Sequence, residues 1–372
     1  MPEPQHTAEV AFDPSDEYRP EPEPEAAPPA WMDGSVRIGI HTSIAGDLAQ
    51  SLDIAQKLGC NALQIFSASP RMWPRASARI PDADARRFRV RRSGLGLGPL
   101  VIHGNYLINL AAAQPMLRVR SVQAFHDEIT RAVALGADFL VAHPGPRGEA
   151  RLEQAVEAAA QAIRQAARGV HLGKLRILIE NTSGMGTALG WRFEEVAAIL
   201  ERLSDLPVGV CLDTAHTFEA GYDIRSAEGL ERTLHQIDDT IGLARVFVVH
   251  VNDSKTPLGS RVDRHEHVGK GKIGLEAFRR ILNHPRLSAA GSQGLPGRAF
   301  ILETPIDRPG DDRRNVKTLW ALAGFTVKQA PRAEDGFSML RGPRKNARKK
   351  AKARGKAKAA KRRTASRSKR KG

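Results

Sequence analysis

From residue 176 onward the chain repeats one pattern four times: RILIEN at 176–181, VGVCLDT at 208–214, RVFVVHVND at 245–253 and AFILETP at 299–305. Each run is almost continuously apolar and then ends in polar side chains. Parallel strands that are covered on both faces have such unbroken apolar runs, whereas half-exposed strands alternate apolar and polar residues. The four runs therefore predict buried parallel strands with polar groups at their carboxyl ends.

The same pattern fills the first half of the chain, with VRIGIH at 36–41, ALQIF at 62–66, LVIHG at 100–104 and DFLVAHP at 138–144. Amphipathic stretches between the runs predict helices, among them 47–58, 116–135, 152–167, 193–203, 275–282 and, after the last run, 313–323. Eight strand–helix units over roughly 290 residues predict an α/β protein with a (β/α)8 TIM barrel. A doubly wound sheet of eight parallel strands is the alternative.

Charge divides the chain into three segments. The 372 residues include 57 Lys and Arg against 41 Asp and Glu, for a net charge of +16. The first 33 residues hold nine acids and one Arg, and residues 341–372 hold 17 basic residues and no acid, which leaves +7 for the segment between them. Charged, apolar-poor segments do not bury enough surface to fold. We therefore expect a disordered Pro/Glu-rich head at 1–34, a barrel domain at 35–325 and a disordered Lys/Arg-rich tail at 326–372.

Several classes of protein are excluded by composition. No apolar run approaches the ~20 residues that a membrane span needs. The first residues, MPEP, lack the basic and apolar regions of a secretory signal. Two cysteines, Cys60 and Cys211, do not make a disulfide framework. These features predict a cytoplasmic monomer without membrane partners, and the basic tail predicts association with the nucleoid through DNA.

The predicted strand ends supply an unusual number of metal-binding side chains. In a TIM barrel the carboxyl ends of all strands meet at one rim, where active sites lie. Any one of these side chains, considered alone, could have an ordinary structural role such as a helix cap or a salt bridge. His41, at the end of the first run, suits such a structural or supporting role. Packing does not account for nine such groups at one rim: His103, His143, Glu180, Asp213, His216, His250, Asp263, His265 and Glu303.

The chemistry of these nine groups indicates bound transition metals. Imidazole together with carboxylate suits Zn²⁺, and also Mn²⁺ or Fe²⁺, whereas Mg²⁺ and Ca²⁺ prefer oxygen ligands. A catalytic zinc ion uses about three protein ligands, so nine candidates predict two or three ions. Clustered metals activate water and stabilise the attacking and leaving oxygens of a phosphoryl displacement. The set therefore predicts phosphoester hydrolysis more strongly than an isomerisation.

A series of short motifs resembles the endonuclease IV family of abasic-site endonucleases. The motifs are HGNYLINL at 103–110, HPG at 143–145, ENT at 180–182, CLDTAH at 211–216, AGYD at 220–223, HVND at 250–253, SRVDRH at 260–265 and LETP at 302–305. They occur in order within a match that runs from about Arg37 to Leu322 and leaves out only the two terminal segments.

The resemblance implies a barrel that holds three zinc ions, with Mn²⁺ as an alternative at one of them. His103 and His143 would hold one ion, and Glu180 would bridge it to a second ion held by Asp213, His250 and Glu303. The third ion would take His216, Asp263 and His265. A hydroxide between the bridged ions would attack the phosphate, with Glu180 and Glu303 as the catalytic carboxylates.

The substrate implied by the resemblance is double-stranded DNA. Cleavage 5′ to an abasic site would leave a 3′-hydroxyl and a 5′-deoxyribose phosphate, a step of base excision repair, and 3′-blocking groups would be removed by the same chemistry. Arg71 and Tyr106 match the family residues that enter the duplex, and an abasic nucleotide is easier to extrude because it has no base to unstack. The alternatives are a metal-dependent sugar isomerase-like barrel and a non-catalytic DNA-binding protein that acts through its basic tail.

Overall fold

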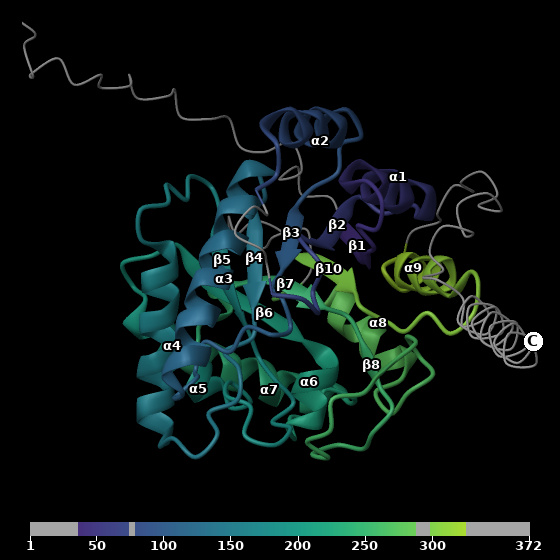
Figure 1. Cartoon of the computed structure of the whole chain (residues 1–372). Coiled ribbons are helices and arrows are strands. Elements are labelled where there is room, and N and C mark those ends of the chain that lie inside the picture. Colours follow the sequence, from purple (N-terminus) through teal and green to yellow (C-terminus); the bar gives the residue numbers. More distant parts are fainter. Residues whose placement is uncertain (1–35, 74–78, 288–297, 325–372) are drawn as a thin grey trace, which may run out of the picture.

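Eight parallel strands close into a barrel in the computed structural model, which describes residues 36–73, 79–287 and 298–324 (Figure 1). Around the barrel the strands follow the order β1-β10-β7-β6-β5-β4-β3-β2. Their bounds are β1 (Arg37–Thr42), β2 (Ala62–Phe66), β3 (Leu100–His103), β4 (Phe139–Ala142), β5 (Arg176–Glu180), β6 (Val208–Asp213), β7 (Val246–His250) and β10 (Ala299–Leu302). The closed sheet confirms the predicted TIM barrel, because a doubly wound sheet would have two open edges.

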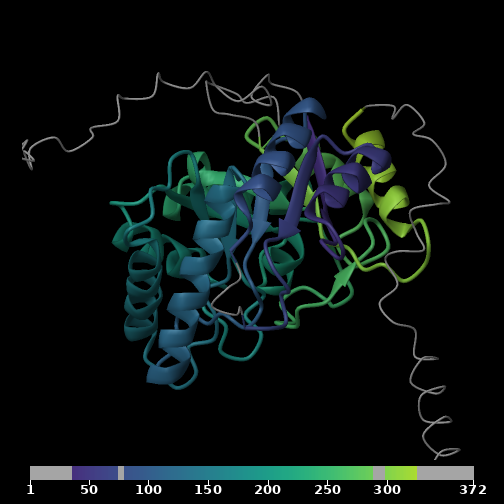
Figure 2. The same ribbon diagram turned by 45° about the horizontal axis from the view of Figure 1, so that its top comes forward.

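Helices lie outside the strands in both views of the molecule (Figures 1 and 2). They are α1 (Leu48–Leu58), α2 (Asp82–Gly94), α3 (Pro115–Ala134), α4 (Leu152–Ala167), α5 (Phe193–Arg202), α6 (Thr214–Glu219), α7 (Ala227–Thr240), α8 (Leu275–Asn283) and α9 (Asp311–Leu322), with a 3₁₀ turn at Leu243–Arg245. The six predicted helices begin and end within two residues of the observed bounds. No range was predicted for α2, α6 or α7.

The last helix, α9, closes the ring of helices against the first. It lies beside α1 in both figures, and the Trp320 indole N–H donates to the carbonyl of Gly59 at 3.0 Å. Local sequence fixes the ends of α1: the Asp47 side chain accepts the Ala49 N–H at its start, and Gly59 takes a left-handed conformation (φ 85°) at its end. The chain therefore turns tightly from α1 into β2.

Successive residues of each strand face either the surrounding helices or the barrel interior, which gives two apolar layers. Side chains of successive strand residues point to opposite faces of a sheet. One face packs against the helices, as in α4, where Ala155, Ala159, Ala162 and Ala166 are fully buried. The other face fills the barrel interior with Ala62, Val101, Phe139, Val141, Leu178, Cys211, Val248, Ala299 and Ile301.

An antiparallel hairpin follows β7 and is additional to the eight strand–helix units. It consists of β8 (Asp253–Ser254) and β9 (His265–Glu266), with Ser254 paired to His265. The sequence predicted a plain loop here, and that prediction is wrong for His265, which lies in a strand. The hairpin brings the segment 255–264 back toward the barrel rim.

The predicted head at 1–34 and tail at 326–372 lie outside the described residues, and so do the predicted domain limits at 35 and 325. Within the described part of the chain, no helix combines the length and the apolar character that are needed to cross a membrane.

Candidate metal centre

Six of the nine predicted metal ligands lie at the carboxyl ends of barrel strands. His103, Glu180, Asp213 and His250 are the last residues of their strands, and His143 and Glu303 directly follow β4 and β10. Each stands two residues beyond a side chain of the barrel interior, so the alternation of the strand aims it at the barrel axis. The pairs are Val101 and His103, Val141 and His143, Leu178 and Glu180, Cys211 and Asp213, Val248 and His250, and Ile301 and Glu303.

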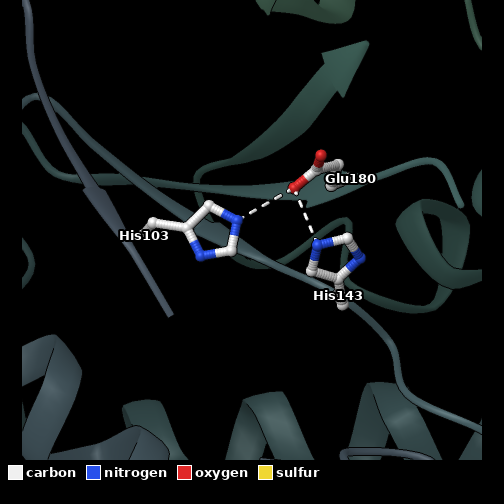
Figure 3. Close-up of side chains that lie close together, drawn as sticks. All are labelled: His103, His143 and Glu180. Carbon is white, nitrogen blue, oxygen red and sulfur yellow. Dashed lines mark hydrogen bonds and ion pairs between the residues drawn. The ribbon is translucent and has the colours of Figure 1, made fainter. Parts of the chain in front are cut away.

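The first ligand group consists of His103, His143 and Glu180 (Figure 3). The Nε2 atoms of both histidines lie 3.2 Å from Glu180 Oε2. His103 Nδ1 lies 2.9 Å from the carbonyl of Gly104 and donates its hydrogen there. Nε2 is therefore the nitrogen that faces Glu180, and it would bind a metal ion placed between them, because a second hydrogen bond at Nδ1 orients the imidazole.

The second ligand group consists of Glu180, Asp213, His250 and Glu303, whose ligand atoms lie within 4.8 Å of one another. His250 Nδ1 lies 2.9 Å from Glu180 Oε1 and 3.3 Å from Glu303 Oε2. Glu180 thus faces the first group with Oε2 and the second with Oε1. A carboxylate in this position can bridge two cations.

The third ligand group combines His216 on α6 with His265 on β9 and the intervening Asp263. Asp263 Oδ2 lies 3.3 Å from His216 Nε2, and Asp263 Oδ1 lies 3.6 Å from His265 Nε2. Asp213 Oδ2 is also 3.7 Å from His265 Nε2, so Asp213 stands between the second and third groups. The Asp213 side chain caps α6 by accepting the His216 N–H at 2.8 Å, which fixes His216 beside it. Asp213 therefore caps a helix, as its sequence position also allowed, in addition to facing the ligand groups.

The histidines and carboxylates of the site stabilise one another's charges. Burial alone would raise the pKa of Glu180, but the neighbouring His143 and His250 outweigh it and hold that pKa well below the usual range. Burial is likewise outweighed at Glu303, where His250 and His41 hold the pKa well below the usual range. Burial lowers the pKa of His216, but Asp213 and Asp263 outweigh it and raise that pKa well above 6.5. Glu180 and Glu303 therefore stay ionised and attract cations, which are protons in the absence of metal.

The donor set fits bound divalent metal of the zinc type. The Nε2 atoms of His216 and His265 are buried and make no well-directed hydrogen bond, and they face carboxylate oxygens 3.3–3.7 Å away. His216 Nδ1 lies 2.9 Å from the carbonyl of Asn181 and donates its hydrogen there, so Nε2 is the nitrogen that faces the site. A metal ion bound between these nitrogens and the carboxylates would take the place of the protons that hold the group together without metal.

Two supporting residues complete the rim, and the sequence indicated only one of them. The Gln64 amide donates to Glu303 Oε1 at 2.5 Å and accepts the His250 Nε2 hydrogen at 2.8 Å. His41, which was expected to be a supporting group, lies with Nδ1 3.0 Å from Gln64 Nε2 and 3.5 Å from Glu303 Oε1. The signal that would have found Gln64 is the same spacing, since it stands two residues beyond the interior residue Ala62.

Cys211 lies within reach of Glu180 and His250 but is not among the nine predicted ligands. Burial raises the pKa of the Cys211 thiol to about 12. Without metal the thiol is therefore protonated and packs as an apolar side chain of the barrel interior.

A separate cluster of Glu266, His267 and Asp307 also has ligand-like spacing. Here the Asn315 amide donates to His267 Nδ1 at 3.0 Å, and its oxygen accepts a backbone N–H, which fixes the direction of the amide. The His267 hydrogen is then on Nε2 and points to Asp307 at 3.4 Å. This is the reverse of the arrangement at His103 and His216, so we interpret His267 as a structural link between the hairpin and the start of α9.

The two predicted DNA-contacting residues lie on adjacent rim loops. Arg71 is exposed, and 61% of Tyr106 is exposed, with its ring edge-on to Phe66 at 5.3 Å. The Asn105 amide donates to the carbonyls of Ser69 and Met72 at 2.9 Å and so fastens the Arg71 loop to the Tyr106 loop. Both side chains therefore extend from one side of the rim.

Comparison with known proteins points to one family. A sequence profile described as a xylose isomerase-like TIM barrel matches residues 52–323. A protein of Solibacter usitatus named probable endonuclease 4 is 47% identical over 293 residues, which cover 78% of this chain and 97% of that protein. The crystal structure of endonuclease IV from Thermus thermophilus has a TM-score of 0.67 and 42% identity, and the match covers 77% of this chain and 99% of that chain.

The barrel itself is shared more widely. A D-tagatose 3-epimerase-like protein superposes with a TM-score of 0.57 at 17% identity, covering 78% of this chain and 97% of that protein, a likeness that shows the fold alone. The relatives named endonuclease 4 and endonuclease IV are instead more than 40% identical over almost their whole lengths. The chain therefore belongs to the endonuclease IV family of DNA-cleaving hydrolases.

Proposed function

We propose that this protein hydrolyses the phosphodiester 5′ to an abasic site in double-stranded DNA, leaving a 3′-hydroxyl and a 5′-deoxyribose phosphate. The observation that carries the proposal is the position of Glu180, whose two carboxylate oxygens face two separate buried ligand groups. The three ligand groups described above would hold three zinc ions. Bound there, the ions supply an activated water and neutralise charge on the reacting phosphate.

The chain's own residues would orient the reaction. Glu180 and Glu303 remain ionised beside His250 and keep the two central ligand groups a fixed distance apart. In the third group the Asp263 side chain is the most exposed member, and it is there that the phosphate oxygens of a bound strand would approach. Removal of a 3′-blocking phosphate group would use the same residues, because the bond that breaks is again a phosphoester.

Exposed apolar side chains on the rim loops support a DNA-binding role for this face. Proteins that distort DNA insert apolar side chains as wedges between bases, and exposed apolar side chains on these loops could serve in this way. Arg71 and Tyr106 would extrude the abasic nucleotide. Four further exposed apolar residues lie on loops at the same rim: Met72, Met185, Val262 and Ile306.

The test is incision of a duplex oligonucleotide that contains one abasic-site analogue. Zinc-loaded protein should cut on the 5′ side of the lesion, and chelator or Glu180→Ala should abolish the cut. Asp307→Ala is the matched control, because it removes an acid from the cluster that we interpret as structural, and it should still cut. Intact substrate with zinc-loaded protein would contradict the proposal and leave the non-catalytic DNA-binding alternative.

A further inference from the structure

Glu219 is a fully buried carboxylate that belongs to none of the three ligand groups. It is the last residue of α6 and follows His216 by three positions, so the two side chains lie on the same face of the helix. His216 turns toward the third ligand group. Glu219 turns toward the segment 254–264, which carries Asp263.

The carboxylate of Glu219 gathers hydrogen bonds from both ends of that segment. Its Oε1 accepts from Ser254 Oγ at 2.6 Å, from Thr256 Oγ1 at 3.3 Å and from the Arg264 backbone N–H at 3.2 Å. The backbone carbonyl of Glu219 accepts the Arg261 N–H at 3.0 Å. One residue of α6 therefore contacts the start, the middle and the end of 254–264.

These contacts bracket the ligands of the third group. Arg261 and Arg264 stand on either side of Asp263, and the backbone N–H of each is held by Glu219. Ser254 pairs with His265 across the hairpin, so its hydroxyl anchors the strand that carries the histidine. With this loop in place, Asp263 Oδ2 lies 3.3 Å from His216 Nε2.

An acid at this buried position carries an energetic cost. Glu219 Oε2 is buried without a hydrogen-bond partner, and burial raises the pKa of the side chain. A buried polar atom without a partner is unfavourable unless the remaining contacts compensate. Here the compensating contacts all go to the one loop that supplies Asp263.

We propose that Glu219 is a positioning residue for the third ligand group, which holds the segment 254–264 so that Asp263 and His265 meet His216. The inference rests on the proposed function only in taking this group as a metal site. It concerns the order of the loop, which can be measured without DNA.

Two variants and two readouts test the role. In metal-stripped protein, Glu219→Ala should speed amide hydrogen exchange across 255–264 about tenfold or more, because several hydrogen bonds are lost together. On reloading, it should retain two zinc ions and lose the third. Glu219→Gln keeps an acceptor oxygen at Oε1 and should restore both the slow exchange and the full zinc content.

Glu195→Ala is a matched control. Glu195 is also a buried glutamate whose carboxylate holds a loop, accepting the Gly190 N–H at 2.8 Å, but that loop carries none of the nine predicted ligands. Glu195→Ala should keep the wild-type zinc content and the wild-type exchange rate at 255–264. Should Glu219→Ala fail to fold, Ser254→Ala removes the 2.6 Å donor and should give a smaller change in the same direction.

The inference is overturned if Glu219→Ala shows the wild-type exchange rate at 255–264 and the full zinc content. It is also overturned if Glu219→Gln loses as much zinc and as much protection from exchange as Glu219→Ala does. Failure of the proposed function looks different. If wild-type protein binds zinc and protects the loop but leaves abasic DNA uncut, the function is refuted while the role of Glu219 stands.

Discussion

Gln64 determines which nitrogen of His250 faces the second ligand group. Its amide oxygen accepts the Nε2 hydrogen, so Nδ1 is the nitrogen that faces Glu180 and Glu303, where it carries a proton in the absence of metal and would offer its lone pair to a bound ion. Its amide nitrogen meanwhile holds Glu303 Oε1. One neutral side chain thus orients two ligands, and neither could turn freely without losing a hydrogen bond.

Gln64→Ala should therefore weaken zinc binding without unfolding the barrel. Loss of such a supporting hydrogen bond costs roughly 10–100-fold in metal affinity or activity. Competition with a calibrated chelator measures the affinity, and the incision rate measures the consequence. Gln123→Ala, on the exposed face of α3, is the control and should match wild type. Wild-type affinity in Gln64→Ala would show that His250 is oriented by other contacts.

Asp312 gives a pH dependence outside the metal centre. Burial, and then the neighbouring Asp311, raise the pKa of Asp312 to about 6. An aspartate in the unfolded chain titrates near 4, so folding favours the protonated form. The stabilisation is complete below about pH 4 and is lost as the pH rises through about 6, and above that pH the ionised carboxylate costs about 3 kcal/mol.

Asp312→Asn should remove this cost. Its melting temperature should exceed that of wild type at about pH 8, and the difference should shrink toward about pH 4, where wild-type Asp312 is protonated. Calorimetry at several pH values measures both. Asp311→Asn is the contrasting variant: Asp311 accepts the Arg308 backbone N–H and pairs with Arg314, so its loss should destabilise the protein. A pH-independent gain in Asp312→Asn would exclude titration as the cause.

The sequence predicted individual residues unevenly, for physical reasons. His103, Glu180 and their companions could be singled out as candidate ligands because ionisable groups at the ends of apolar strands are seldom needed for packing. Gln64 was missed because an amide at a strand end has no distinctive chemistry of its own. Glu219 was missed because its partners, such as Ser254 and Arg264, lie more than thirty residues away and meet it only in the folded chain.

At the scale of elements, the barrel closes where β1 lies between β2 and β10, and Gly39 allows the close approach. Gly39 pairs with Ala62 on one side and Ile301 on the other. A Cβ on Gly39 would lie 2.7 Å from the Ala62 carbonyl group and 2.6 Å from Ile301 Cδ1. Because β1 is hydrogen-bonded to a strand on each side, its backbone cannot move away from the added carbon without disturbing both neighbours.

Gly39→Ala should consequently lower the free energy of unfolding by about 1–3 kcal/mol or more. Gly94→Ala, at the end of α2, is the matched control: its Cβ would meet no atom within 4 Å, and it should raise stability by roughly 0.4–1 kcal/mol through the unfolded chain. Urea denaturation of both variants measures the difference. Equal stabilities would mean that the strand pairs of β1 adjust to the extra carbon.

Element prediction succeeded where periodicity extends over several residues. α4 matches its predicted bounds because buried alanines such as Ala155, Ala159 and Ala166 recur at helical spacing along its length. The six-residue α6 and the two-residue strands β8 and β9 are too short to show a period. Their positions follow from contacts, namely the Asp213 cap and the pairing of Ser254 with His265.

At the scale of the whole molecule, the predicted ligands and the basic tail are separated along the chain. The nine predicted ligands lie between His103 and Glu303, whereas residues 341–372 contribute 17 positive charges and lie outside the described residues. The segment between head and tail carries +7 by itself. Binding to DNA in general and chemistry at the lesion should therefore be separable by truncation.

Deletion of 341–372 should weaken binding to undamaged duplex at low salt while kcat on an abasic duplex holds. Counterion release makes such binding fall steeply with salt, with a slope set by the number of phosphates neutralised, so the truncated protein should show a shallower salt dependence. A variant with the tail residues in scrambled order should bind like wild type, because charge and not sequence is what acts. Removal of residues 1–33, which carry −8, should shift affinity the opposite way if the head competes with DNA for basic groups. A collapse of kcat on tail deletion would place the tail within the catalytic step, and that would contradict a centre whose ligands all come from the barrel.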